Sequence, residues 1–154
     1  MAEPVFQGPG EGRPSDNPLG VELVFKVRGE QTDGALTAFE NLVASGEGPP
    51  MHTHANEDEA IYVLDGDVRF KLGDEIRNGA AGSYVFIPRG MPHAWQNVGR
   101  GAARMLFHFT PSGMERFFDG FAALEAPGPG AFETVGAEVG LDVVGPPLAQ
   151  SDPV

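Results

Sequence analysis

The chain has 154 residues, a formal net charge of −12 at pH 7 and no cysteine. Its length suits one domain with its own core, and the lack of cysteine excludes disulfides and thiolate metal ligands. The negative charge disfavours nucleic acid and anionic membrane surfaces as partners, and no apolar run approaches the roughly 18 residues of a membrane span. Since the N-terminus also lacks the pattern of a signal peptide, we expect a cytoplasmic protein that binds neither nucleic acid nor membrane.

The N-terminal segment, residues 1–19, is rich in proline and glycine and poor in apolar side chains, so we expect a flexible arm. Residues 20–112 consist of short runs of β-branched and aromatic residues separated by turn-forming residues, which is typical of an all-β domain. The predicted strands span residues 21–27, 35–44, 59–64, 68–72, 75–78, 82–87, 93–97 and 102–110. Residues 35–44 also fit a helical stripe, but their position before a histidine-containing strand favours a strand.

The spacing of apolar residues changes after the last of these strands. Ser112 and Glu115 form a capping-box pattern that predicts the start of a helix. The apolar face of this helix would consist of Phe117, Phe118, Phe121 and Leu124. A proline- and glycine-rich linker ends it, and residues 132–139 predict a second short helix. We therefore expect a C-terminal helical segment over residues 113–145, packed on the β-domain, and a tail over residues 146–154.

One segment of the chain carries the residues of a candidate metal site. His52 and His54 are separated by a single residue, and Glu59 follows five residues later. Side chains at positions i and i+2 of a strand point to the same face, so both imidazoles can point inward while a short loop returns the carboxylate. Histidine and carboxylate ligands with open coordination positions describe a transition-metal site that can take substrate or oxygen.

A second segment further along the chain completes a pair of motifs. The two segments read Gly46-x5-His52-x-His54-x4-Glu59-x6-Gly66 and Gly82-x5-Pro88-x-Gly90-x2-His93-x3-Asn97. In order and spacing they closely resemble the two sequence motifs of the cupin superfamily. The later sequence Thr-Pro-Ser-Gly-Met-Glu-Arg-Phe-Phe, from residue 110 to residue 118, is also similar to small bacterial cupins of the quercetin dioxygenase-like kind.

The resemblance implies an all-β fold: a conical β-barrel, also called a jelly roll or double-stranded β-helix, with one or two short C-terminal helices. It places this cupin barrel over residues 20–112. It also implies one divalent transition metal ion, of iron, nickel, manganese, cobalt, copper or zinc. The implied ligands are His52, His54, Glu59 and His93. The alternative is a cupin that binds no metal, in which these histidines are simply hydrogen-bonded.

Other polar residues near this segment are alternative candidates for the site. Glu57 and Asp58 could replace Glu59 in a shifted register, but the spacing from Glu59 to Gly66 favours Glu59. His108 lies opposite in parity to the apolar residues of its strand, so we expect it on the outer face.

The predicted lining of the substrate pocket is apolar, although each of its residues could equally belong to the ordinary core. It consists of Phe39, Ile61, Val63, Phe86, Trp95, Met105 and Phe107. Such a wall suits an aromatic small molecule as substrate. The resemblance also implies a homodimer. An outward-facing apolar set would support it: Tyr62, Leu64, Phe70 and Leu72.

Three functions remain open at this point. The first is a metal-dependent dioxygenase, quercetin 2,3-dioxygenase-like, that acts on an aromatic or enolic small molecule with Glu59 as a catalytic proton acceptor. The second is a metal-dependent cyclase, isomerase or lyase that uses no redox chemistry. The third is a small-molecule-binding cupin without turnover, because one fold hosts very different functions.

Overall fold

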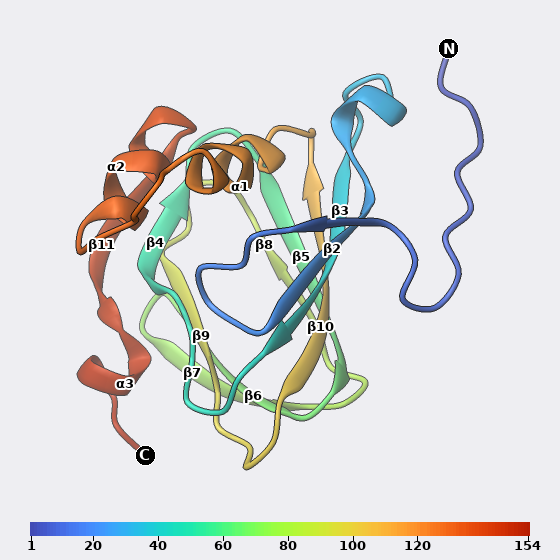
Figure 1. Cartoon of the computed structure of the whole chain (residues 1–154). Helices are drawn as coiled ribbons and strands as arrows, with labels where there is room; N and C mark the ends of the chain where they lie inside the picture. The colour runs from blue at the N-terminus through green and yellow to red at the C-terminus, as the bar shows by residue number, and fades with distance from the viewer.

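A computed structural model describes all residues from 1 to 154. Its strands form two antiparallel sheets that face each other (Figure 1). The first sheet contains, in spatial order, β1 (Arg13–Ser15), β2 (Glu22–Val27), β3 (Thr37–Val43), β10 (Ala103–Thr110), β5 (Asp58–Asp65) and β8 (Tyr84–Ile87). The second contains β11 (Leu141–Pro147), β4 (Pro50–His54), β9 (His93–Asn97), β6 (Asp67–Leu72) and β7 (Glu75–Ala80). The expected jelly roll is confirmed, as two facing sheets whose strand pairing does not close into one continuous barrel.

Short helices complete the fold. They are the 3-10 turn η1 (Gly29–Gln31), and the α-helices α1 (Glu115–Ala122), α2 (Ala131–Glu138) and α3 (Leu148–Ser151). Figure 1 shows α1 and α2 lying across one end of the two sheets. Because Phe117 and Phe118 of α1 are buried in the main core cluster, this helix closes that end of the space between the sheets. None of the α-helices combines the length and apolar character needed to cross a membrane.

Alternation along the strands builds the core between the sheets. On β10, Met105, Phe107 and Phe109 are buried, whereas Arg104 and His108 on the other face are exposed. Residues 37–43 form the predicted strand and not a helix, and the β3 ring of Phe39 stacks on that of Phe107 with centroids 4.9 Å apart. The inward side chains at alternate positions therefore form an apolar core, and their burial stabilises the fold.

The structure corrects the expected N-terminal arm. Within residues 1–19, β1 pairs with β2 at the edge of the first sheet, with Pro14 opposite Val24. Proline is tolerated there because an edge strand needs no donor on its outer side. The composition alone indicated an arm because it does not reveal this backbone pairing, in which only residues 13–15 take part.

The C-terminal boundaries are also corrected. β11 begins inside the expected helical segment 113–145 and runs into the expected tail 146–154. It occupies the outer edge of the second sheet beside β4, where Pro147 pairs with Pro50. The two prolines that end β11 suggested a tail, but they too fit an edge strand.

The outward-facing apolar set predicted for a homodimer is only partly exposed. Tyr62 and Leu64 on β5 are 40% and 39% exposed, but Phe70 on β6 is 1% exposed and belongs to the core. Leu72 lies between these extremes. Phe70 points inward because it pairs with Trp95 of β9, and residues directly opposite each other in antiparallel strands share one face.

The carboxylate of Glu115 does not form the expected capping box with Ser112, because α1 begins at Glu115 and no side chain caps it. Instead, Glu115 accepts hydrogen bonds of 2.8 Å from the backbone N–H groups of Gly29 and Gly113, and another from the Thr37 hydroxyl. Burial alone would raise the pKa of Glu115, but these hydrogen bonds lower it below its ordinary value of 4.5. A buried carboxylate thus joins α1 to η1 and β3.

We predict that Glu115→Gln destabilises the folded state by roughly 1–3 kcal/mol at neutral pH, because an amide leaves part of this donor set unsatisfied. The folded-state pKa of Glu115 is depressed, so its contribution is present above the ordinary pKa of 4.5 and is lost as the pH falls through the lower folded-state value. Denaturant unfolding of both proteins from about pH 7 to 3.5 should show the difference shrinking toward acid. A variant of the exposed Glu125, Glu125→Gln, is the control; a pH-independent difference would contradict the assignment.

Candidate metal centre and its pocket

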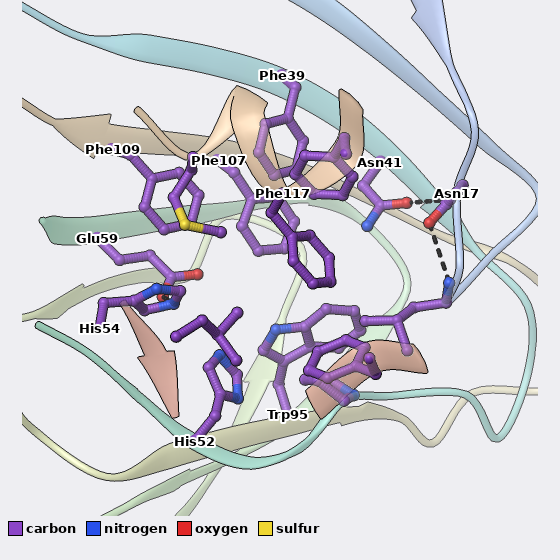
Figure 2. A pocket seen from close by; sticks show the side chains of 16 residues that line it. Asn17, Phe39, Asn41, His52, His54, Glu59, Trp95, Phe107, Phe109 and Phe117 are labelled. Carbon is purple, nitrogen blue, oxygen red and sulfur yellow. Dashed lines mark hydrogen bonds and ion pairs between the residues drawn. The ribbon is translucent and has the colours of Figure 1, made fainter. Parts of the chain in front are cut away.

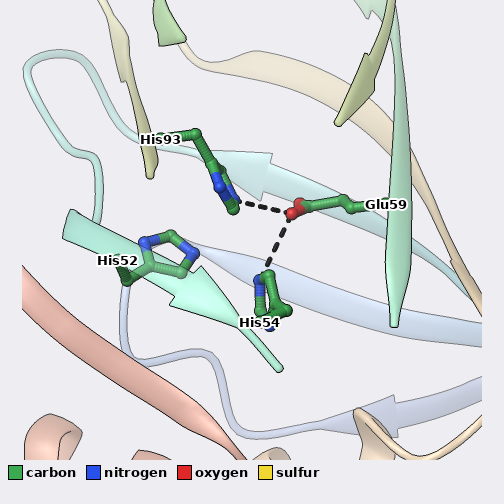
Figure 3. A group of neighbouring side chains, drawn as sticks. All are labelled: His52, His54, Glu59 and His93. Carbon is green, nitrogen blue, oxygen red and sulfur yellow. Dashed lines mark ion pairs between the residues drawn. The ribbon is translucent and has the colours of Figure 1, made fainter. Parts of the chain in front are cut away.

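Four polar side chains meet between the two sheets. His52 and His54 come from β4, His93 from β9 and Glu59 from β5 (Figure 3). One ligand atom from each lies within 4.8 Å of the others, and each residue is at most 4% exposed. The cluster brings together all four ligands implied by the sequence motifs.

The strand pairing explains why these residues meet. β4 and β9 are neighbours in the second sheet and pair at His52 and His93. His54 lies two residues after His52 and shares its inward face. Glu59 reaches the cluster from the opposite sheet, where it pairs with Phe109 of β10 and Ile87 of β8. The site is therefore built from two sheets and depends on how they pack together.

Backbone carbonyls set the direction of two imidazoles. His52 Nδ1 lies 2.7 Å from the Pro50 carbonyl oxygen, and His93 Nδ1 lies 2.9 Å from that of Met91. A carbonyl can only accept, so each Nδ1 carries the proton and donates it. In the neutral ring, Nε2 then keeps its lone pair, which is the arrangement typical of metal-binding histidines.

The inner atoms of the cluster lack hydrogen-bond partners. Glu59 Oε2 lies 2.8 Å from His93 Nε2 and 3.3 Å from His54 Nε2. Despite these short distances, none of the three atoms makes a hydrogen bond of acceptable geometry, and all three are buried. Buried polar atoms without partners are costly. Because nitrogen and carboxylate oxygen converge here, the donor set fits a divalent transition metal ion.

The electrostatics of the cluster favour a neutral His52 and an ionised Glu59, as metal binding requires, but they favour a protonated His93. Burial lowers the pKa of His52 well below its ordinary value, and the neighbouring imidazoles lower it further. Burial alone would raise the pKa of Glu59, but the His93 and His54 imidazoles hold it far below its ordinary value. For His93, the effect of Glu59 outweighs burial and raises the pKa. Metal ligation needs neutral imidazoles and an ionised carboxylate, so binding would release any proton held by His93.

The competing acidic residues lie outside the cluster. Asp58 accepts a 3.2 Å hydrogen bond from Arg89 Nε. Glu57 is 2% exposed, and burial raises its pKa, but it does not join the group of ligand atoms. His108 lies on the exposed face of β10, as its parity predicted. Of the three neighbouring acids, the structure therefore brings Glu59 alone to the histidines.

A pocket with about 420 Å³ of empty space, part of it open to solvent, adjoins the cluster (Figure 2). His52, His54 and Glu59 form part of its wall. Three of the predicted lining residues are present: Phe39, Trp95 and Phe107. The sequence analysis missed other parts of the wall, including Met114, Phe117, Phe118 and Phe132 from the C-terminal region, and Asn17, Leu19 and Asn41. The inward parity of Asn41 with Phe39 was a signal that could have identified it.

The structure does not bring the remaining predicted residues to the pocket. Ile61, Val63 and Met105 are fully buried in the core and lie outside the wall. Phe86 is 57% exposed on the outer face of β8. Its orientation follows from register, because Phe86 pairs with Ala60, whose neighbour Ile61 points inward. For Phe86, the prediction was wrong because strand parity alone, without its pairing, leaves the inner face undetermined.

Comparisons with known proteins agree with this architecture. Residues 39–109 match the cupin domain family. Polyketide synthase CurC of Streptomyces cyaneus is 35% identical over 82 residues, which cover 52% of this chain and 53% of the relative. Quercetin 2,3-dioxygenase of Bacillus subtilis (strain 168) is 37% identical over 57 residues, which cover 36% of this chain and 17% of the relative. The chain spans about half the length of the first of these curated relatives, and less of the second.

Solved structures share the fold at low sequence identity. KdgF from Halomonas sp. superposes with a TM-score of 0.62 at 18% identity, over 71% of this chain and 94% of KdgF. A variant of the oxalate decarboxylase of Bacillus subtilis gives a TM-score of 0.60 at 20% identity, over 73% of this chain and 30% of that protein. The paired motifs, the jelly roll and the family match agree: residues 39–109 of this chain form a cupin domain.

Proposed function

We propose that this cupin is a metal-dependent enzyme that acts on an aromatic or enolic small molecule. Of the candidate reactions, we favour dioxygenation. One observation carries the proposal: the buried histidine and carboxylate cluster forms one end of a pocket whose walls are largely apolar and include several phenylalanine rings and Trp95. Aromatic walls favour planar substrates through stacking and edge contacts, and they exclude water from the reacting atoms.

The residues of the cluster would have two chemical roles, metal binding and proton transfer. His52, His54, Glu59 and His93 would hold the ion, which would supply Lewis acidity and, for a redox metal, electron transfer to oxygen. Glu59 would accept a proton from a substrate hydroxyl at its free carboxylate oxygen. A carboxylate that also binds the ion would be a weak base, and a weak base needs an acidic hydroxyl. Phenols and enols meet that requirement better than aliphatic alcohols do.

The curated relatives support two reactions. The similarity to a quercetin 2,3-dioxygenase favours oxygen-dependent chemistry. The similarity to polyketide synthase CurC favours a second candidate, a metal-dependent cyclase, isomerase or lyase that needs no oxygen. Both candidates use the same cluster and the same kind of planar, oxygen-bearing substrate, so they differ only in their requirement for oxygen.

Oxygen dependence separates the two candidates. We expect metal-loaded protein to consume oxygen with aromatic diols or enols, and to lose turnover under anaerobic conditions. Oxygen uptake measured with an electrode, alongside product analysis by mass spectrometry, checks this expectation. Turnover that continues at the same rate without oxygen would instead establish the cyclase, isomerase or lyase.

Loss of a ligand should remove the metal. Alanine substitution of His52, His54 or His93 should each lower metal affinity by more than about 10-fold, since even indirect partners of a ligand contribute 10- to 100-fold. The matched control is His108→Ala, which removes an exposed histidine on β10 and should leave occupancy unchanged. Metal content after reconstitution with several divalent ions is the measurement.

The same experiment has a thermal readout. An ion that binds only the folded state raises its melting temperature, so stripping the metal should lower Tm in the natural protein. The three alanine variants should show little response to added metal. Well under one equivalent of metal bound by the natural protein after reconstitution would refute the metal site.

Glu59→Gln separates the two roles assigned to this residue. The amide oxygen can still contact the metal but cannot accept a proton, so metal content should largely persist while turnover falls roughly 100-fold or more. Metal analysis and steady-state kinetics on the same preparation make the comparison. A proportional fall of metal and activity would show that Glu59 acts only as a ligand. No change in either would exclude Glu59 and direct attention to Glu57.

A further inference from the structure

The end of the pocket away from the metal cluster carries an unusual polar residue. Asn41 lies on β3, two residues after Phe39, and its side chain faces inward among aromatic rings (Figure 2). It is 3% exposed. An amide in such surroundings is costly unless its donor and acceptor atoms are used. The partners of its oxygen and its nitrogen therefore decide what this end of the pocket can bind.

Backbone groups fix the orientation of the neighbouring amide, Asn17. The Leu19 N–H, which can only donate, contacts Asn17 Oδ1 at 3.2 Å. Asn17 Nδ2 lies 3.1 Å from the Glu22 carbonyl oxygen, which can only accept. Exchanging the oxygen and nitrogen of the Asn17 amide would break both hydrogen bonds. Its Nδ2 therefore points to Glu22 and to Asn41.

The orientation of Asn41 follows from that of Asn17. Asn17 Nδ2 donates to Asn41 Oδ1 at 2.6 Å, so the oxygen of Asn41 is occupied. The NH2 group of Asn41 must then face the other way, and Figure 2 shows its nitrogen turned toward the cavity. Phe39 and Phe117, drawn beside it, offer no acceptor side chain. A chain of hydrogen bonds beginning at the backbone thus directs one donor into an apolar pocket.

We propose that Asn41 is a specificity-determining residue that donates a hydrogen bond to an oxygen acceptor on the bound small molecule, and that Asn17 positions it. The inference rests on the proposed function, since it concerns the same pocket. It narrows the substrate class to planar aromatic or enolic molecules with two polar ends. One end presents a hydroxyl to the metal cluster, and the other presents a carbonyl or ether oxygen to the Asn41 amide. The Asn41 donor remains unsatisfied when a substrate lacks that second oxygen.

A pair of matched probes tests the donor directly. The probes are 2,3-dihydroxynaphthalene and its 6-acetyl derivative, which adds one carbonyl at the end distant from the diol. Trp95 is the only tryptophan of the chain and lines the pocket, so its fluorescence reports binding to metal-loaded protein. We expect the natural protein to prefer the acetyl probe by about 10- to 100-fold, the scale of leaving a buried donor without a partner.

Variants distinguish recognition from a structural role. Asn41→Leu has similar size but no donor, and should abolish the preference between the two probes. Asn41→Asp replaces the donor by an acceptor and should disfavour the acetyl probe. Asn17→Ala frees the Asn41 amide to rotate and should reduce the preference without removing it. The matched control is Asn78→Leu on the exposed face of edge strand β7, which should change nothing.

The outcomes separate this inference from the proposed function. A natural protein that binds both probes equally, or an Asn41→Leu variant that keeps the preference, would overturn the inference while leaving the proposed function intact. A preference that persists in metal-free protein, together with absence of turnover, would support the inference and refute the enzyme. If Asn41→Leu fails to fold, Asn41→Asp and Asn17→Ala test the inference instead. For each variant, the ratio of its affinities for the two probes is compared with that of the natural protein. Failure of both probes to bind would overturn the inference and the aromatic pocket together.

Discussion

The burial of three imidazoles and one carboxylate between two sheets is the constraint on which this structure depends. Removing such groups from water is expensive, and the cluster leaves the inner atoms of His54, Glu59 and His93 without hydrogen bonds. The fold tolerates them because apolar packing on every side supplies the stability that these groups do not. The same dryness strengthens every electrostatic interaction inside the cluster. The buried polar cluster therefore depends on the apolar core around it for its stability.

The residues of the candidate metal cluster could be predicted from the sequence for a physical reason. His52 and His54 are two residues apart and share one face of β4, and the short connection to β5 returns Glu59 from the opposite sheet, so these three residues could be placed from their intervals. The register between distant strands is a different matter, because it is set by packing and not by neighbours in the chain. Phe86 illustrates the difference: its strand was predicted, but the side that faces the core was not.

The two ends of the chain were harder to predict, and both contribute to the pocket. Proline and glycine indicated mobility at the N-terminus and a tail at the C-terminus, yet each end supplies an edge strand. Edge strands tolerate prolines that a central strand would exclude. A proline-rich composition is therefore a poor guide to whether a segment forms a strand at the edge of a sheet. The pocket wall consequently combines histidines at motif spacing with residues such as Asn17 and Phe132 that no motif marks. The candidate metal ligands therefore lie at motif spacing, whereas the rest of the pocket wall comes from segments distributed along the chain.

The pairing of β11 with β4 links the candidate metal centre to the order in which the chain is made. Leu141 pairs with His54 and Val143 with His52, so β4 becomes an interior strand only after this late strand has been added. Until then, a growing chain presents its histidine strand as an open edge, with backbone groups exposed to water and to other chains. Because domains fold as the ribosome releases them, β4 can gain this neighbour only after residues 141–147 have been made. A chain that lacks β11 therefore carries two residues of the candidate metal cluster on a strand with one unpaired edge.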